Sequence, residues 1–202
     1  MNKISPTLKV LVVAAAVVAM VGCNTLSKEA KSGSIIVIQS MTGTTIEGDE
    51  VAYLQSDVID ADGLVRVNNA TAHLTARLVN PNPIDGPSQF NDVVLTDYNV
   101  TYELPAGGGT PGVDVPQPFA GNFSTVLLPI DDEVAVPFVV VLEAAKQAAP
   151  LVGLIGTSTV LERKAKIEIF GHDLNGHEVS ATGFLTIYFA DYQTIVTAAV
   201  KK

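Results

Sequence analysis

The chain contains very little cysteine, tryptophan or basic charge. One of its 202 residues is a cysteine, Cys23, and none is a tryptophan. A single thiol excludes an internal disulfide and a multi-cysteine metal site, so the hydrophobic core has to stabilise the fold. Twelve lysines and arginines stand against 21 aspartates and glutamates, which gives a formal charge of −9. A chain of this charge does not attract nucleic acid electrostatically.

Long apolar runs and catalytic motifs are lacking after residue 22. The longest apolar run there, Val134–Leu142, contains Pro137 and is too short to span a bilayer as a helix. The nucleophile elbow of the α/β hydrolases, the H-E-x-x-H zinc motif and the Walker phosphate loop do not occur. We therefore expect a protein that is not an enzyme, with no cofactor and no metal. An unrecognised hydrolase is the remaining catalytic alternative.

The N-terminus carries the most specific signal. Lys3 and Lys9 precede an apolar run, Val10–Val21, whose length suits the core of a signal peptide. The run ends in Met20-Val21-Gly22-Cys23, which resembles the lipobox of bacterial lipoproteins. This resemblance implies a signal peptide over 1–22, a lipid on Cys23 that anchors the protein in a membrane of the bacterial envelope, and a tether over 23–33. Asn24 follows the cysteine where an inner-membrane retention signal typically has aspartate, which favours the outer membrane.

A period of two dominates the sequence from Ser34 onward and predicts β-strands. In Thr71–Asn80, alanines and leucines alternate with polar residues. The segment Val134–Val140 is more apolar, which predicts a central strand. The motif Asp173-Leu174-Asn175-Gly176 separates two further alternating segments and predicts a hairpin turn.

These strands predict an all-β fold, an antiparallel β-sandwich of immunoglobulin-like architecture over 34–192. One short helix is expected at Leu142–Ala149, where alanine, glutamate and lysine precede Pro150. Residues 193–202 form either a tail or a terminal helix.

Two loops are expected to carry recognition, because loops on a rigid sandwich commonly do. The first, Pro105–Gly121, contains Gly107, Gly108 and Gly109. Its match to G-x-G-x-x-G does not predict dinucleotide binding, since Pro111 removes a donor and no helix follows. Either Val113–Val115 forms a short edge strand or this loop is mobile. The second loop holds Asn80, Asn82 and Asp85 among three prolines.

Metal sites are the weaker alternatives. His172 and His177 flank the predicted turn; in a four-residue loop they would be cross-strand neighbours and could share a metal with Asp173 or Glu178. In a two-residue loop His172 would instead face Val179. Asp57, Asp60 and Asp62 suggest a calcium loop, but the EF-hand register places Val58 and Asn69 at its first and last ligand positions.

One further resemblance concerns the sandwich itself. Three segments are similar to the late-embryogenesis-abundant type 2, or WHy, domain: Leu78-Val79-Asn80-Pro81-Asn82-Pro83, Thr125–Ile130 and Val134–Val140. The helix expected from Leu142 has the corresponding place. This resemblance implies an immunoglobulin-like sandwich without catalytic activity.

Together these observations predict a non-catalytic, lipid-anchored envelope protein that acts in protein interaction or in stress protection. Its expected partners are the membrane, through Cys23, and another envelope protein. The alternative is a carrier that binds an apolar ligand between its sheets.

Overall fold

The computed structural model describes residues 32–80 and 88–195. Cys23, the expected signal peptide, Asn82 and Asp85 lie outside these residues. Among the described residues, no helix is long and apolar enough to cross a membrane. The strands are β1 (Ser34–Thr44), β2 (Glu50–Val51), β3 (Tyr53–Asp57), β4 (Asn68–Leu78), β5 (Val93–Glu103), β6 (Phe119–Leu128), β7 (Glu133–Val141), β8 (Leu161–Asp173) and β9 (Glu178–Ala190).

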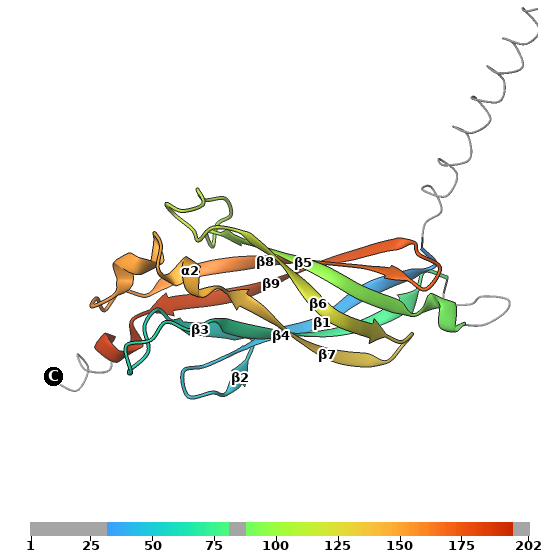
Figure 1. The fold of residues 1–202 in the computed structure, drawn as a ribbon, viewed down its shortest axis with the longest axis horizontal. Coiled ribbons are helices and arrows are strands. Elements are labelled where there is room, and N and C mark those ends of the chain that lie inside the picture. The colour runs from blue at the N-terminus through green and yellow to red at the C-terminus, as the bar shows by residue number, and fades with distance from the viewer. Residues whose placement is uncertain (1–31, 81–87, 196–202) are drawn as a thin grey trace, which may run out of the picture.

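The predicted two-sheet sandwich is confirmed (Figure 1). One sheet has the strand order β2-β1-β4-β7 and the other has β3-β9-β8-β5-β6. The pairing is antiparallel except between β3 and β9, which run parallel. The expectation of a purely antiparallel sheet is therefore wrong at this edge. The parallel pair joins Tyr53–Asp57 to residues more than a hundred positions later in the chain, a pairing that local alternation does not reveal.

Strand β4 confirms the alternation predicted for Thr71–Asn80. Ala72, Leu74 and Ala76 are fully buried between the sheets. Thr75, on the face expected to be polar and exposed, is also buried. Its hydroxyl donates a hydrogen bond of 2.8 Å to the carbonyl oxygen of Asp132, in the β6–β7 turn, which covers it.

Strand β7 is an edge strand, so the prediction of a central position for Val134–Val140 is wrong. Val136, Phe138 and Val140 are buried by the opposite sheet rather than by neighbouring strands on both sides. Pro137 was the signal for an edge, because a proline cannot donate to a second ladder.

The predicted C-terminal hairpin is confirmed, with β8 and β9 paired from Leu161↔Phe189 to His172↔Glu178. Gly176 has φ +86°, the conformation that the Asn-Gly turn requires. The 13 residues of β8 rise about 3.3 Å each, so the two ends of the sandwich lie about 40 Å apart. Figure 1 shows the turn of this hairpin at one end and helix α2 at the other.

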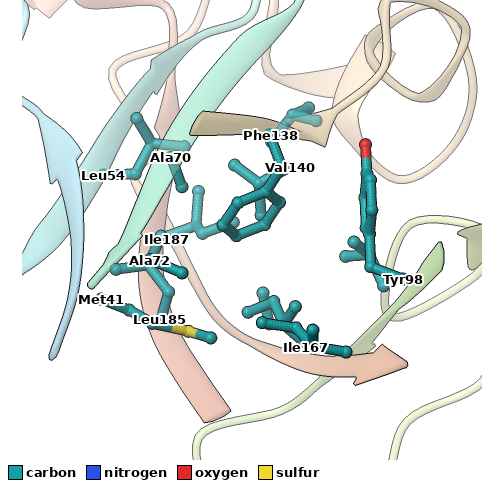
Figure 2. Packing of buried hydrophobic residues seen from close by; sticks show 14 of the residues in the cluster. Met41, Leu54, Ala70, Ala72, Tyr98, Phe138, Val140, Ile167, Leu185 and Ile187 are labelled. Atoms are coloured by element: carbon teal, nitrogen blue, oxygen red, sulfur yellow. The ribbon is translucent and has the colours of Figure 1, made fainter. Parts of the chain in front are cut away.

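The space between the sheets is filled with side chains. Figure 2 shows residues from both sheets in contact, among them Met41, Ala72, Phe138, Ile167 and Leu185. Tyr98 belongs to this cluster, with its ring 5.3 Å from that of Phe138. A filled core is the usual state of a protein interior and leaves the surface as the place for binding.

The predicted helix is shorter than expected: α2 covers Glu143–Lys146, and a 3₁₀ turn, η2, follows at Leu151–Leu154. A second 3₁₀ turn, η1, covers Gln89–Asn91. After Asp191, a helical turn begins at Tyr192.

Candidate functional site

The two ends of the sandwich differ in chemistry. We call residues 32–34, 79–80, 88–92 and 173–177 the N-terminal tip. We call the opposite end, with α2, η2 and the loops 58–67 and 104–118, the distal end (Figure 1). The expected contact residues are divided between the two: Asn80 belongs to the tip, and Gly107, Gly108 and Gly109 belong to the distal end.

Asp173 is the centre of the N-terminal tip. Its carboxylate is fully buried and accepts four hydrogen bonds. Oδ2 accepts from the hydroxyl of Ser32 at 2.8 Å and from Nδ1 of His177 at 3.1 Å. Oδ1 accepts from the backbone N–H groups of Asn175 and His177, each at 2.9 Å. Burial raises the pKa of Asp173, but the hydrogen bonds from His177 and Ser32 outweigh it, so the pKa lies below its ordinary value.

Backbone contacts hold the rest of the tip to this centre. The Ser34 hydroxyl donates to the carbonyl oxygen of Asn91 at 2.6 Å, and Asn175 Nδ2 donates to that of Phe90 at 3.3 Å. The N–H of Leu174 donates to the carbonyl oxygen of Asp92 at 3.1 Å. The N–H of Val79 donates to the carbonyl oxygen of Gly33 at 2.8 Å. Four segments that are distant in sequence are therefore joined into one surface.

Three apolar side chains project from this surface into solvent. Val79, Phe90 and Leu174 are 60%, 54% and 43% exposed. The charged residues of the tip, in contrast, are turned inward. Asp173 is buried, His177 bonds to it, and Asp92 accepts the N–H of Ile130 at 3.1 Å. Among the described residues of the tip, the exposed side chains are therefore apolar or uncharged polar ones.

The two histidines do not form a metal site with the acids near them. His172 pairs with Glu178 across the hairpin, which corresponds to neither predicted register partner. Its Nδ1 donates to the carbonyl oxygen of Asp173 at 3.0 Å, while His177 turns toward the carboxylate of Asp173. In the part of the chain that the structure describes, no three histidine, aspartate, glutamate or cysteine side chains converge as metal ligands.

A hollow of about 720 Å³ lies beside the tip. It forms where Thr96 is an extra residue in β5, which breaks the register between β5 and β8. Asp97, Glu178 and Phe170 contribute to its mixed polar and apolar lining. A bulge of this kind redirects side chains and is common near binding sites.

Lys146 is the unusual residue of the distal end. Its side chain is buried, and Nζ donates one hydrogen bond of 2.6 Å, to the backbone carbonyl oxygen of Asp57. Burial lowers the pKa of Lys146 to about 8, although the nearby Asp60, Asp57 and Glu143 oppose the change. An amine with this pKa could act as a base or nucleophile. Its burial, however, keeps a substrate away from Nζ.

Two buried aspartates complete the distal end. Asp57 accepts the N–H of Tyr192 at 3.2 Å, and burial raises its pKa above the ordinary value. Asp191 accepts the N–H groups of Gly156 at 2.8 Å and Thr194 at 3.0 Å. Together with Lys146, these residues join β3, α2, η2 and the C-terminal helical turn.

The acidic cluster expected as a weak calcium loop is divided by the fold. Arg66 bonds to Asp60 through Nε and to Asp62 through Nη2 at 2.6 Å, whereas Asp57 is turned inward. The three carboxylates therefore have separate partners: Arg66 for Asp60 and Asp62, and the N–H of Tyr192 for Asp57.

The glycine-rich loop is not a strand, and backbone hydrogen bonds within it stabilise its conformation. The Leu104 N–H donates to the carbonyl oxygen of Gly108 at 2.8 Å, and the N–H of Gly107 returns to that of Leu104 at 2.7 Å. Val113–Val115 does not form an edge strand: Val115 has an isolated bridge to Pro111, and the N–H groups of all three residues donate to the carbonyl oxygen of Thr110. Val115 is fully buried, so it fixes the base of the loop.

A groove of about 460 Å³ lies on the flank where β6 and β7 face each other. Its lining includes the rings of Tyr98, Phe123 and Phe138, with 4.9 Å between the centroids of Tyr98 and Phe123. Tyr98 also hydrogen-bonds the backbone of Val139, and burial raises its pKa.

Sequence reasoning missed Asp173 and Lys146 as central residues. Asp173 was considered as a turn residue and as a possible metal ligand, but not as a hydrogen-bond acceptor, although an aspartate before Asn-Gly commonly accepts local N–H groups. For Lys146 there was no signal, because in a short Glu-Ala-Ala-Lys helix the lysine is expected in solvent.

No protein-family model and no curated protein matches the chain. The resemblances to a lipobox and to the WHy domain therefore stay predictions.

Proposed function

We propose that this protein is a non-catalytic, lipid-anchored envelope module that binds another envelope protein through its distal end. The observation that supports this best is the position of Ser32, which is hydrogen-bonded to Asp173 at the N-terminal tip. A lipid on Cys23 would hold the tip near the membrane. It would also place the distal end about 40 Å further out, because β8 spans that length.

The surface of the distal end suits protein recognition. Exposed apolar side chains gather there on several loops, beside charged and polar groups. They are Leu64, Val67, Val113, Val152, Ile155 and Val160. Scattered single apolar residues need no explanation, but a group of them at one end commonly marks an interaction surface. The hydrogen-bonded glycine-rich loop, with Val113 65% exposed, presents this surface on a fixed frame.

The anchor is tested in cells with the Cys23→Ala variant. The wild-type chain should incorporate labelled palmitate and sediment with membranes, while Cys23→Ala should do neither. Labelled, membrane-bound Cys23→Ala would contradict the proposed anchor.

The distal binding surface is tested by site-specific photo-crosslinking in the native host. A photoreactive residue at Val113 should trap a discrete envelope protein. The matched control is Phe184, which is similarly exposed but lies on the outer face of β9. Equal trapping at both positions, or none at Val113, would contradict the assignment of the surface.

Stress protection is the other form that this function could take, and the WHy resemblance is its support. A protective protein should preserve the activity of a dried or frozen test enzyme better than an equal mass of an unrelated acidic protein. Preservation no better than that control would leave partner binding as the function.

A carrier for an apolar ligand is the second candidate, favoured by the aromatic groove between β6 and β7. A fluorescent fatty acid should bind the wild-type chain, and Phe123→Ser should weaken binding. Phe184→Ser, outside the groove, should have no effect. Unchanged binding in Phe123→Ser would exclude the groove as the site.

A further inference from the structure

Three large apolar side chains of the N-terminal tip are exposed in the described fold. Val79, Phe90 and Leu174 come from three different segments, yet hydrogen bonds between those segments hold them at the same end. Phe90 is further fixed because η1 begins with a capping box, in which the Ser88 hydroxyl accepts the N–H of Phe90 at 3.2 Å. Such fixed exposure of large apolar groups is typical of a surface that contacts another phase or protein.

We propose that the N-terminal tip is a membrane-contact surface, which inserts Phe90, Leu174 and Val79 into the interfacial region of a bilayer. This inference rests on the proposed lipid anchor. Eight residues separate Cys23 from Ser32, and a fully extended chain of that length reaches about 30 Å at most. With Ser32 bonded to Asp173, an anchor on Cys23 confines the tip to this distance from the lipid.

The electrostatics of the tip favour a lipid surface over a charged partner. The described residues of the N-terminal tip include no lysine or arginine, and the carboxylates of Asp92 and Asp173 are both engaged in hydrogen bonds within the protein. Insertion therefore requires neither the desolvation of a free charge nor an anionic lipid. Removal of the three apolar side chains from water supplies the driving force. We accordingly expect zwitterionic phosphatidylcholine to be sufficient.

The composition of the chain permits a direct test. Because it contains no tryptophan, a Phe90→Trp variant has one fluorescent indole, located at the tip. Because Cys23 is the only cysteine, the chain starting at Cys23 can be coupled through this thiol to phosphatidylcholine vesicles that contain a maleimide lipid.

The matched control is Val152→Trp. Val152 is 44% exposed and, like Phe90, lies in a 3₁₀ turn, but at the distal end. After coupling, Phe90→Trp should shift its emission to shorter wavelength and be quenched by brominated acyl chains, while Val152→Trp should do neither. Adding Leu174→Asp to Phe90→Trp should reduce both effects. Unchanged thermal melting of each variant shows that it remains folded.

Two results would overturn the proposal: a Phe90→Trp indole that stays in water after coupling, or equal shifts in Phe90→Trp and Val152→Trp, which would indicate non-specific adsorption. Because the vesicle experiment supplies the anchor chemically, it can succeed even if Cys23 is not lipidated in cells. The palmitate experiment can likewise succeed while this one fails, so the two failures are distinguishable.

Discussion

The two ends of the sandwich each bury a charged side chain, and they stabilise it in opposite ways. Asp173 at the N-terminal tip accepts four hydrogen bonds, and its pKa is lowered, so the charged form is favoured. Lys146 at the distal end donates to a single carbonyl oxygen, and its pKa is lowered to about 8, so the charged form is disfavoured. Equal burial therefore accompanies a favoured charged form at one end and a disfavoured charged form at the other.

This difference matches the proposed roles. An anchor-side tip benefits from a fixed geometry, since it has to present the same apolar side chains toward the membrane. At the distal end, the node around Lys146, Asp57 and Asp191 is polar and joins four chain segments. Changes there should alter the stability of that end without altering the tip.

The largest expected effect is at Asp173. Asp173→Ala removes a buried carboxylate and leaves part-buried donors of Ser32, Asn175 and His177 without their acceptor, and should lower the free energy of unfolding by about 3–4 kcal/mol. Urea unfolding measures this change. Asp132→Ala, in the exposed β6–β7 turn, is the control and should stay within about 0.5 kcal/mol of wild type. Similar values for the two variants would mean that Asp173 is not the centre of the tip.

The next effect is a dependence of the free energy of unfolding on pH in the alkaline range, caused by the titration of Lys146. Between pH 8 and the unfolded pKa of 10.5, the unfolded chain binds the proton more than the folded chain does. Stability should therefore rise with pH in this window, by about 3 kcal/mol at most.

Lys146→Met should abolish the alkaline rise, while Lys164→Met, on the surface of β8, should retain it. Unfolding curves recorded from pH 7 to 10.5 provide the comparison. A rise that persists in Lys146→Met would assign it to another group.

A smaller effect tests whether the distal loop is a fixed element. Gly109 has φ +118°, and a Cβ there would lie 2.8 Å from Cγ1 of the buried Val115. Gly109→Ala should cost about 2 kcal/mol, from backbone strain and this contact. Gly107→Ala, also at positive φ but in open space, should cost about 1 kcal/mol. Equal melting temperatures for the two variants would indicate that the loop moves away from Val115.

The smallest expected change in the free energy of unfolding is at Ser32, which donates a hydrogen bond to Asp173. Ser32→Ala removes one of the four donors to Asp173 and should cost about 1 kcal/mol. Differential scanning calorimetry at neutral pH can detect such a change. A loss as large as that of Asp173→Ala would mean that Ser32, and not the hairpin turn, is the principal support of the carboxylate.

Much of the fold was predictable because alternation is a local property. Ala72, Leu74 and Ala76 were expected on the buried face of a strand, and the Asn175-Gly176 turn was expected between two strands. The errors arose where position in the sheet matters. Val134–Val140 looked central because of its apolar residues, but burial by the facing sheet produces the same composition in an edge strand.

The candidate sites were harder to predict than the fold. The two expected contact loops were treated alike, whereas the structure separates Asn80 from Gly107–Gly109 by the length of the sandwich. Val79, Phe90 and Leu174 were not singled out at all. Each is an ordinary isolated residue in the sequence, and only their shared location gives them meaning.

The sequence by itself determined the charge, the single thiol, the strand alternation and the hairpin turn, because these depend on composition or on neighbouring residues. The tertiary structure decided which strands form the edges of the sheets and that Ser32 lies at the N-terminal tip. It also decided which groups form hydrogen bonds with the buried charges of Asp173 and Lys146. The bonds from Asp173 to Ser32 and from Lys146 to Asp57 join residues 141 and 89 positions apart. Such pairs form only after the sheets have packed, so local pattern cannot specify them.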